Sequence, residues 1–137
     1  MNDDNGPAIE LLSPPDMFKG PTYEHASRVG DFIFIAGQVA KDIEGRVIGP
    51  NDAEAQAHAV FESLGKVLAY CGATPDDVVK VTTYLVDSAD APKVTPIRRA
   101  FFGAHRPPHT GVVIKALGAP EVKLEVEAIA VARRRTP

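Results

Sequence analysis

The sequence predicts an α+β domain, in which a mixed β-sheet carries two helices on one of its faces. Two amphipathic helical patterns interrupt a series of short runs rich in β-branched residues, which gives the order strand, strand, helix, strand, helix, strand, strand. The chain has 137 residues, of which 45% are hydrophobic and 24% charged, as is usual for one soluble globular domain. We expect residues 1–19 to form an N-terminal arm and residues 20–137 to form that single domain.

The first helix is predicted over residues 52–71. Asn51 and Asp52 are good N-caps, and Glu54 stands three residues after Asn51, as in a capping box. Gly72 ends the pattern. Between these ends, apolar residues recur at helical spacing: Ala57, Val60, Phe61, Leu64, Val67, Leu68 and Cys71.

A second, shorter helix is predicted to begin where Thr95 precedes Pro96, because this pair fits an N-cap followed by the first helical position. It is expected to end at Gly103. Within the N-terminal arm, only residues 9–12 are expected to dock on the domain. The strands are predicted at residues 25–29, 32–36, 78–86, 111–116 and 122–131.

The last predicted strand has two unlike faces. Its alternate residues from Val122 to Ala130 are all apolar, so this face is expected to lie under the helices. A monomer would expose the apolar residues of the other face, together with half of the apolar run at residues 32–36, and we therefore expect a homo-oligomer. That other face mixes charged with apolar residues: Lys123, Glu125, Glu127, Ile129 and Val131.

Charge and composition argue against several kinds of partner. The net charge is −3, from 15 basic and 18 acidic residues, whereas binding to nucleic acid needs a basic surface. No apolar run approaches the length that spans a bilayer, and no secretory signal is visible, so we expect no membrane partner. Cys71 is the single cysteine, which excludes an intrachain disulfide and fits a reducing cytoplasm.

Elimination leaves a carboxylate and a histidine as candidates for chemistry. His105 and His109 have the spacing of two metal ligands on a helix, but Pro107 and Pro108 exclude a helix there, and we expect no metal. No Gly-x-Ser-x-Gly elbow and no glycine-rich phosphate loop occurs, so no cofactor is expected. Glu125 lies mid-strand on the mixed face, where partial burial at a subunit boundary would raise its pKa.

Both candidates have a structural alternative that the residues alone leave open. Glu125 can instead form an ion pair with Lys123, Lys115 or an arginine and only lock the interface. His109, which two prolines precede, can instead be a surface loop histidine.

Three long segments resemble the RidA/YjgF family, also known as endoribonuclease L-PSP-like proteins: residues 30–38, 72–85 and 122–130. The resemblance extends over about residues 20–131. It implies a chorismate-mutase-like fold with a six-stranded mixed sheet and two helices on one face. It also implies a homotrimer whose sheets form an inner barrel with clefts between subunits. The activity it implies is cofactor-independent hydrolysis of reactive enamines and imines, with release of ammonia.

The resemblance assigns roles to six positions. Glu125 matches the carboxylate that positions or activates water, and Tyr23, Gly37 and Thr95 match residues that line the cleft. His109 stands where the deaminating members have an arginine that binds the substrate carboxylate. Histidine lacks the planar, permanently charged fork of arginine. Gly111 stands where many members have cysteine, which predicts a more open pocket floor.

Two functions follow as expectations. In the first, Glu125 and His109 act in the hydrolysis of a C=N bond in a small metabolite. In the alternative, the trimer has lost its deaminase activity and is a non-catalytic, metabolite-binding or regulatory protein. A ribonuclease is disfavoured, because the chain is acidic and has no basic groove.

Overall fold

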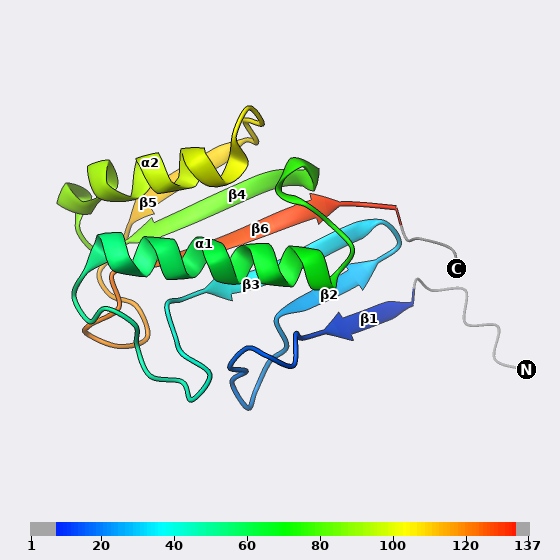
Figure 1. Ribbon diagram of the computed structural model, residues 1–137, viewed down its shortest axis with the longest axis horizontal. Helices are drawn as coiled ribbons and strands as arrows, with labels where there is room; N and C mark the ends of the chain where they lie inside the picture. The colour runs from blue at the N-terminus through cyan, green and yellow to red at the C-terminus, as the bar shows by residue number, and fades with distance from the viewer. Residues whose placement is uncertain (1–7, 134–137) are drawn as a thin grey trace, which may run out of the picture.

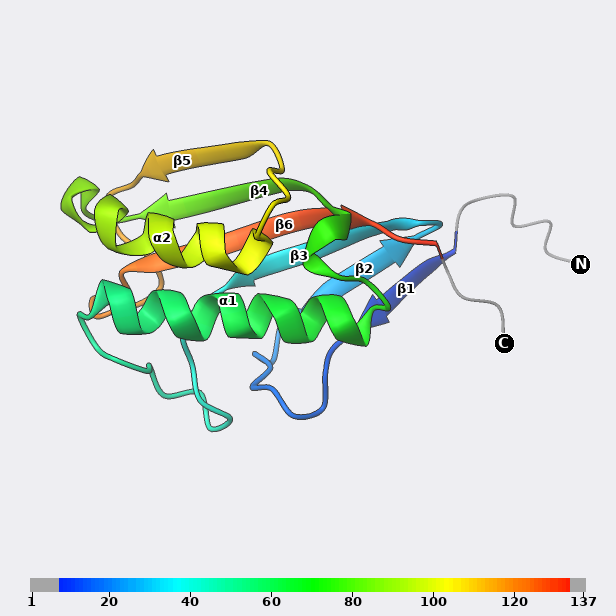
Figure 2. The ribbon, with the colours of Figure 1, turned by 45° about the horizontal axis from the view of Figure 1, so that its top comes forward.

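The structure is a computed structural model, and it describes residues 8–133. Six strands form one sheet in the order β1-β2-β3-β6-β4-β5, and all neighbours are antiparallel except the parallel pair β4 and β5. Helices α1 and α2 lie side by side over one face of the sheet (Figures 1 and 2). The predicted α+β architecture is confirmed. The elements are β1 (Ile9–Leu12), β2 (Ala26–Val29), β3 (Phe32–Gln38), α1 (Ala53–Tyr70), β4 (Val78–Leu85), α2 (Ala91–Phe102), β5 (His109–Val113) and β6 (Leu124–Val131).

The N-terminal arm contributes to the sheet. Ile9–Leu12, the segment expected to dock, forms β1 at the sheet edge and pairs with β2. The division of the chain at residue 20 stays a prediction.

Helix α1 agrees with the apolar pattern along its length but begins with a different cap. The carboxylate of Asp52 accepts a hydrogen bond from the backbone N–H of Ala55 at 3.0 Å. Asn51 precedes the cap in a left-handed conformation with φ of 63°, so the capping box expected from Asn51 and Glu54 does not form.

The start predicted for the second helix is wrong. Helix α2 begins at Ala91, after a short 3₁₀ turn, and Pro92 occupies its first turn. Pro96 therefore lies inside the helix, where it removes the backbone bond to the Pro92 carbonyl. Thr95 is not the N-cap, and its hydroxyl instead donates to the Ala91 carbonyl at 2.9 Å.

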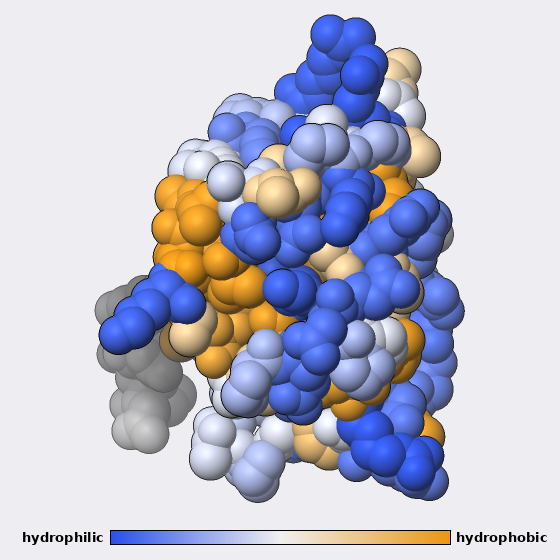
Figure 3. All heavy atoms as spheres, turned by 90° about the vertical axis from the view of Figure 1, so that its left-hand side faces the viewer, coloured by the Kyte–Doolittle hydropathy of each residue, from blue (hydrophilic) through white to orange (hydrophobic). Residues whose placement is uncertain are grey.

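The sheet has one buried and one open face, as the last strand predicted. The residues of β6 alternate between buried and half-buried, with Leu124 and Val126 fully covered by the helices. On the open face, Phe32 and Phe34 of β3 remain 52% and 45% exposed. Figure 3 shows hydrophobic side chains gathered on the side of the molecule away from the helices (left in the view). An apolar surface of this kind is typical of a subunit interface.

The buried Arg28 side chain donates hydrogen bonds to backbone carbonyls at the ends of three elements, β2, β6 and α1. The side chain of this β2 residue is 4% exposed and donates to the carbonyls of Cys71 at 2.6 Å, Ala132 at 2.8 Å and Gly30 at 3.3 Å. These carbonyls follow α1, β6 and β2, and the bond to the Cys71 carbonyl is buried, so the guanidinium satisfies an acceptor that water does not reach.

We expect Arg28→Ala to lower the free energy of unfolding by about 2–4 kcal/mol, because it leaves the buried Cys71 carbonyl without its donor and removes a buried side chain. Urea unfolding at constant pH measures the change. Arg46→Ala is the matched control, since that side chain is 74% exposed and pairs only on the surface with Asp42 and Glu44. The control is expected to change stability by less than about 1 kcal/mol. Equal losses in both variants would show that Arg28 adds nothing specific.

Candidate functional site

Glu125 projects from the middle of β6 onto the open face of the sheet, directly against Gly37. The pairing of β3 with β6 shifts between Ile35 and Gln38, and this irregularity brings Gly37 over the glutamate. A Cβ on residue 37 would lie 2.5 Å from Glu125 Cδ and 2.6 Å from Oε2. Only a glycine therefore allows the carboxyl group its present position.

The surroundings of Glu125 favour the protonated carboxyl more than water does. Partial burial raises its pKa above the ordinary 4.5, the charge of Glu127 raises it further, and Lys41 opposes both effects. Glu127 in turn accepts a hydrogen bond from the Tyr84 hydroxyl at 2.6 Å, which raises the pKa of that phenol. Glu125 is thus a carboxyl group that can exchange protons closer to neutral pH than an exposed glutamate.

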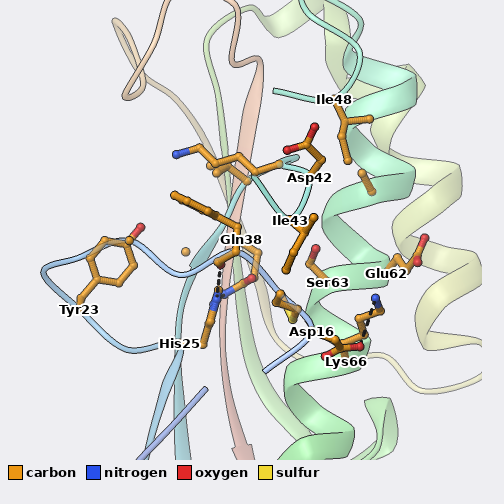
Figure 4. Close-up of a pocket in the computed structure, with 17 residues that line it drawn as sticks. Asp16, Tyr23, His25, Gln38, Asp42, Ile43, Ile48, Glu62, Ser63 and Lys66 are labelled. Atoms are coloured by element: carbon orange, nitrogen blue, oxygen red, sulfur yellow. Dashed lines mark hydrogen bonds and ion pairs between the residues drawn. The ribbon is translucent and has the colours of Figure 1, made fainter. Parts of the chain in front are cut away.

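Gly37 and Tyr23 line the same cavity, which has a volume of about 300 Å³. It lies between the segment before β2, the end of β3, the loop that follows it and α1 (Figure 4). His25 and Gln38 are buried at its wall. The Phe18 carbonyl accepts from His25 Nε2 at 2.8 Å, and the Gln38 amide lies 3.1 Å from Nδ1. These bonds hold the His25 ring in a fixed orientation, whereas Tyr23 is 54% exposed.

His109 lies on the other side of the sheet. It is the first residue of the edge strand β5 and pairs in parallel with Val81 of β4, which is buried under the helices. Its Nε2 lies 3.1 Å from the Thr83 hydroxyl, a buried group two residues along β4. A Cβ on Gly111 would lie 3.2 Å from His109 Cε1. The His109 ring therefore approaches Gly111 closely, although Gly111 remains exposed, and the more open pocket floor expected there stays a prediction.

The His109 ring also lines a second cavity, of about 220 Å³, between α2 and the segment that leads into β5. Partial burial lowers the pKa of His109 below the ordinary 6.5, and the positive charges of Arg98 and Lys80 lower it further. The imidazole is therefore mostly neutral at pH 7.

The six candidate residues form two groups that do not meet within one chain. Glu125 packs against Gly37, and Tyr23 shares the first cavity with Gly37. His109 packs over Gly111 on the face that carries the helices. Thr95 is half-buried on α2, where its hydroxyl is used by the Ala91 carbonyl. Glu125 and His109 therefore do not meet in the single subunit, and their expected meeting in a cleft between subunits stays a prediction.

Metal binding and membrane insertion find no support in the part of the chain that the structure describes. Within residues 8–133, no three His, Cys, Asp or Glu side chains gather closely enough to hold a metal ion. His105 instead has its Nε2 2.7 Å from the Val78 carbonyl. None of the helices in residues 8–133 combines the length and the apolar character that crossing a bilayer requires.

Comparison with known proteins matches residues 19–132 to the model of the family described as "Endoribonuclease L-PSP". The chain belongs to the endoribonuclease L-PSP family. A RutC family protein of Pyrococcus abyssi is 40% identical over 111 residues, which are 81% of this chain and 86% of that protein. The 2-iminobutanoate/2-iminopropanoate deaminase of Mus musculus is 32% identical over 112 residues, 82% of each chain.

Solved structures of the endoribonuclease L-PSP family share this fold. An endoribonuclease-like protein of Thermotoga maritima superposes with a TM-score of 0.83 at 31% identity, over 91% of this chain and 98% of its own. RidA from an Antarctic Psychrobacter superposes with a TM-score of 0.83 at 26% identity, over 90% of this chain and 99% of its own. The family and fold that the resemblance implied are therefore confirmed.

Two charged neighbours of the candidate residues were not expected from the sequence. Lys41 follows β3 and acts on the charge of Glu125, but nothing in its sequence context distinguishes it from other surface lysines. Arg98 does carry a signal. It stands on the same stripe of α2 as Val94 and Phe102, four residues from each, and both of these are buried. An arginine on an otherwise apolar inward stripe is unusual and points to a function.

Proposed function

We propose that this protein hydrolyses reactive enamine or imine metabolites, releasing ammonia, at clefts between the subunits of a homotrimer. Its substrate would be a small molecule of the cytoplasm, and no cofactor takes part. The observation that carries the proposal is the half-buried Glu125 carboxyl, seated on Gly37 with a raised pKa. The similarity to the mouse 2-iminobutanoate/2-iminopropanoate deaminase supports the same class of reaction.

The chemistry assigned to Glu125 is proton transfer during attack by water. Its carboxylate accepts a proton from water as the oxygen bonds to the imine carbon and passes that proton to the nitrogen, which becomes an amine. The resulting carbinolamine then collapses. Glu125 accepts the hydroxyl proton and gives a proton to the amine nitrogen, so the C=O bond forms, the C–N bond breaks and the nitrogen leaves as ammonia. The sum is R₂C=NH plus H₂O giving R₂C=O plus NH₃.

The proposed cleft needs residues from two subunits. Glu125 lies against Gly37 on the open face of the sheet, whereas His109 lies over Gly111 on the face that carries the helices. A neighbour that docks on the apolar open face can bring its edge strand β5 toward Glu125. In this arrangement the neutral His109 offers a hydrogen bond to the substrate, and Thr95 lines the cleft from α2.

The proposal is tested by incubating the protein with imines freshly generated by amino-acid oxidases and following the loss of a semicarbazide-trapped product. We expect faster loss with at least one imine of a small amino acid. Silence across the panel, from a protein shown to be folded and oligomeric, would contradict hydrolysis. That result would favour the alternative, a non-catalytic binding trimer. One observation already favours this alternative: His109, which bonds to Thr83, stands where the deaminating members have the arginine that binds the substrate carboxylate.

We expect wild-type protein at micromolar concentration to sediment at three times the chain mass, and Phe34→Glu to sediment as a monomer. Phe34 is exposed on the open face and stacks on Phe32, so a charge there would be buried without a partner in the interface. Tyr70→Glu is the control, because Tyr70 is equally exposed but lies on α1. A trimeric Phe34→Glu variant would place the interface elsewhere.

A further inference from the structure

The cavity beside β5 is strongly basic. Three guanidinium groups and two imidazoles line it, and no acidic residue does: Arg98, Arg99, Arg106, His105 and His109. Its remaining lining residues are apolar or glycine. Within residues 8–133, none of the three arginines lies within 4.0 Å of a carboxylate oxygen in an ion pair. The cavity therefore concentrates positive charge that the rest of the subunit does not neutralise.

Among these cations, Arg98 is the one that the fold has drawn inward. It is half-buried, whereas Arg99 and Arg106 are exposed. Its position on α2 falls between buried Val94 and buried Phe102, on the stripe that faces the sheet. Burying a guanidinium without an anion costs free energy, and natural folds tolerate it where a ligand supplies the missing charge.

Arg98 also lies close to His109. Both residues line the same cavity, and the charge of Arg98 lowers the pKa of the imidazole. The His109 ring itself is folded over Gly111 toward Thr83, and it is mostly neutral. Position 109 thus presents no permanent charge to a ligand, while a permanently charged, planar group stands next to it on α2.

We propose that Arg98 binds the carboxylate of the substrate, in the role that an arginine at position 109 would otherwise fill. This inference rests on the proposed function in that it takes the substrate to be an imino acid. The guanidinium fork forms two parallel hydrogen bonds to the carboxylate, which fixes its orientation as well as its charge. His109 contributes a single neutral hydrogen bond beside it. The subsite lies within one subunit, so it can be examined by binding as well as by catalysis.

The test measures binding of 2-oxobutanoate, a stable carboxylate of the product class, by isothermal titration calorimetry. We expect Arg98→Gln to weaken binding by at least about tenfold relative to wild type. Arg98→Lys keeps the charge but loses the planar fork, and its affinity for 2-oxobutanoate is expected to lie between those of wild type and Arg98→Gln. Arg99→Gln removes an exposed arginine of the same cavity and is expected to weaken binding less than Arg98→Gln does. Arg46→Gln is the matched control, because Arg46 lies outside the cavity and its side chain is 74% exposed, and it is expected to bind 2-oxobutanoate as wild type does.

A neutral analogue separates a carboxylate contact from a structural role. Wild type and Arg98→Gln are expected to bind 2-oxobutanamide, which lacks the charge, with equal affinity. A loss of amide binding in Arg98→Gln would instead show that the arginine only supports the fold. Stronger binding of inorganic phosphate than of 2-oxobutanoate would overturn the assignment to a carboxylate, and equal losses in Arg98→Gln and Arg99→Gln would overturn the assignment to Arg98.

Binding and hydrolysis can fail separately. If wild type binds 2-oxobutanoate through Arg98 but accelerates the loss of no imine, the proposed hydrolysis fails and the carboxylate subsite stands. If imines are hydrolysed and Arg98→Gln leaves both 2-oxobutanoate affinity and KM unchanged, the subsite fails and the hydrolysis stands. Absence of 2-oxobutanoate binding to wild type at millimolar concentrations would also overturn the subsite.

Discussion

Replacing Glu125 by glutamine is expected to lower kcat/KM for imine hydrolysis by on the order of 10²–10⁴-fold, the usual contribution of a general acid–base group. Glutamine keeps the shape that fits against Gly37 but cannot accept a proton from water. The fold should be retained, because the amide removes a charge that the site desolvates. Initial rates in the semicarbazide assay measure the loss, and thermal unfolding checks the fold.

Glu54→Gln serves as the control for the Glu125 variant. This glutamate is exposed in the first turn of α1, on the face of the molecule away from Glu125. The control is expected to retain wild-type rates. If Glu125→Gln also retained them while remaining a folded trimer, Glu125 would be an interface residue and the proton acceptor would have to be sought elsewhere.

The pH dependence of kcat/KM gives an independent view of the same group. As a base, Glu125 works only when ionised, so activity falls as the pH drops through its pKa in the free protein. Burial and Glu127 raise that pKa, and the acid limb is therefore expected above the ordinary 4.5 of a glutamate. Besides Glu125 and Glu127, the ionisable groups nearby are Lys41 and the Tyr84 hydroxyl, which donates to Glu127. A limb at or below pH 4.5 would contradict the assignment.

The sequence predicted a helix or strand correctly where its apolar residues followed a single regular spacing. The apolar spacing along α1 and the alternation along β6 each have a single solution, because only one face of each element can meet the core. The start of α2 was missed since Thr95 and Pro96 form a good beginning of a helix, while the true start at Ala91 depends on a 3₁₀ turn before it. A helix could begin at either position by local sequence alone, and the 3₁₀ turn at Ser88–Asp90 places the beginning at Ala91.

The site was predictable in its parts but not in its assembly. Gly37 was expected to line the cleft that holds Glu125, and the Glu125 carboxyl packs directly against it. The face on which His109 lies depends on the parallel register of β5 with β4, a pairing between segments far apart in the chain. Sequence spacing carries no information on that register, so the separation of His109 from Glu125 could be learned only from the fold. The position of Arg98 beside His109 depends on the same pairing.

Replacing Gly37 by alanine is expected to lower kcat/KM by on the order of 10²-fold while changing stability little. The new methyl group would lie 2.5 Å from Glu125 Cδ, so the carboxyl must move away. Gly37 has an ordinary backbone conformation, and the neighbour that must move is the end of a flexible side chain, so the fold can adapt. A displacement of about 1 Å in a catalytic group is enough for a loss of this size.

Gly118→Ala provides the comparison for the Gly37 variant, because a Cβ on Gly118 would meet no atom within 4 Å. Rates and thermal midpoints of this control should equal those of wild type. The decisive result is the combination of Gly37→Ala with Glu125→Gln. If alanine at position 37 acts only by displacing the carboxyl, it should cost little further activity once that carboxyl is gone, since the two changes remove the same interaction. Losses that multiply would show instead that Gly37 serves the reaction through a contact of its own, such as its backbone facing the substrate.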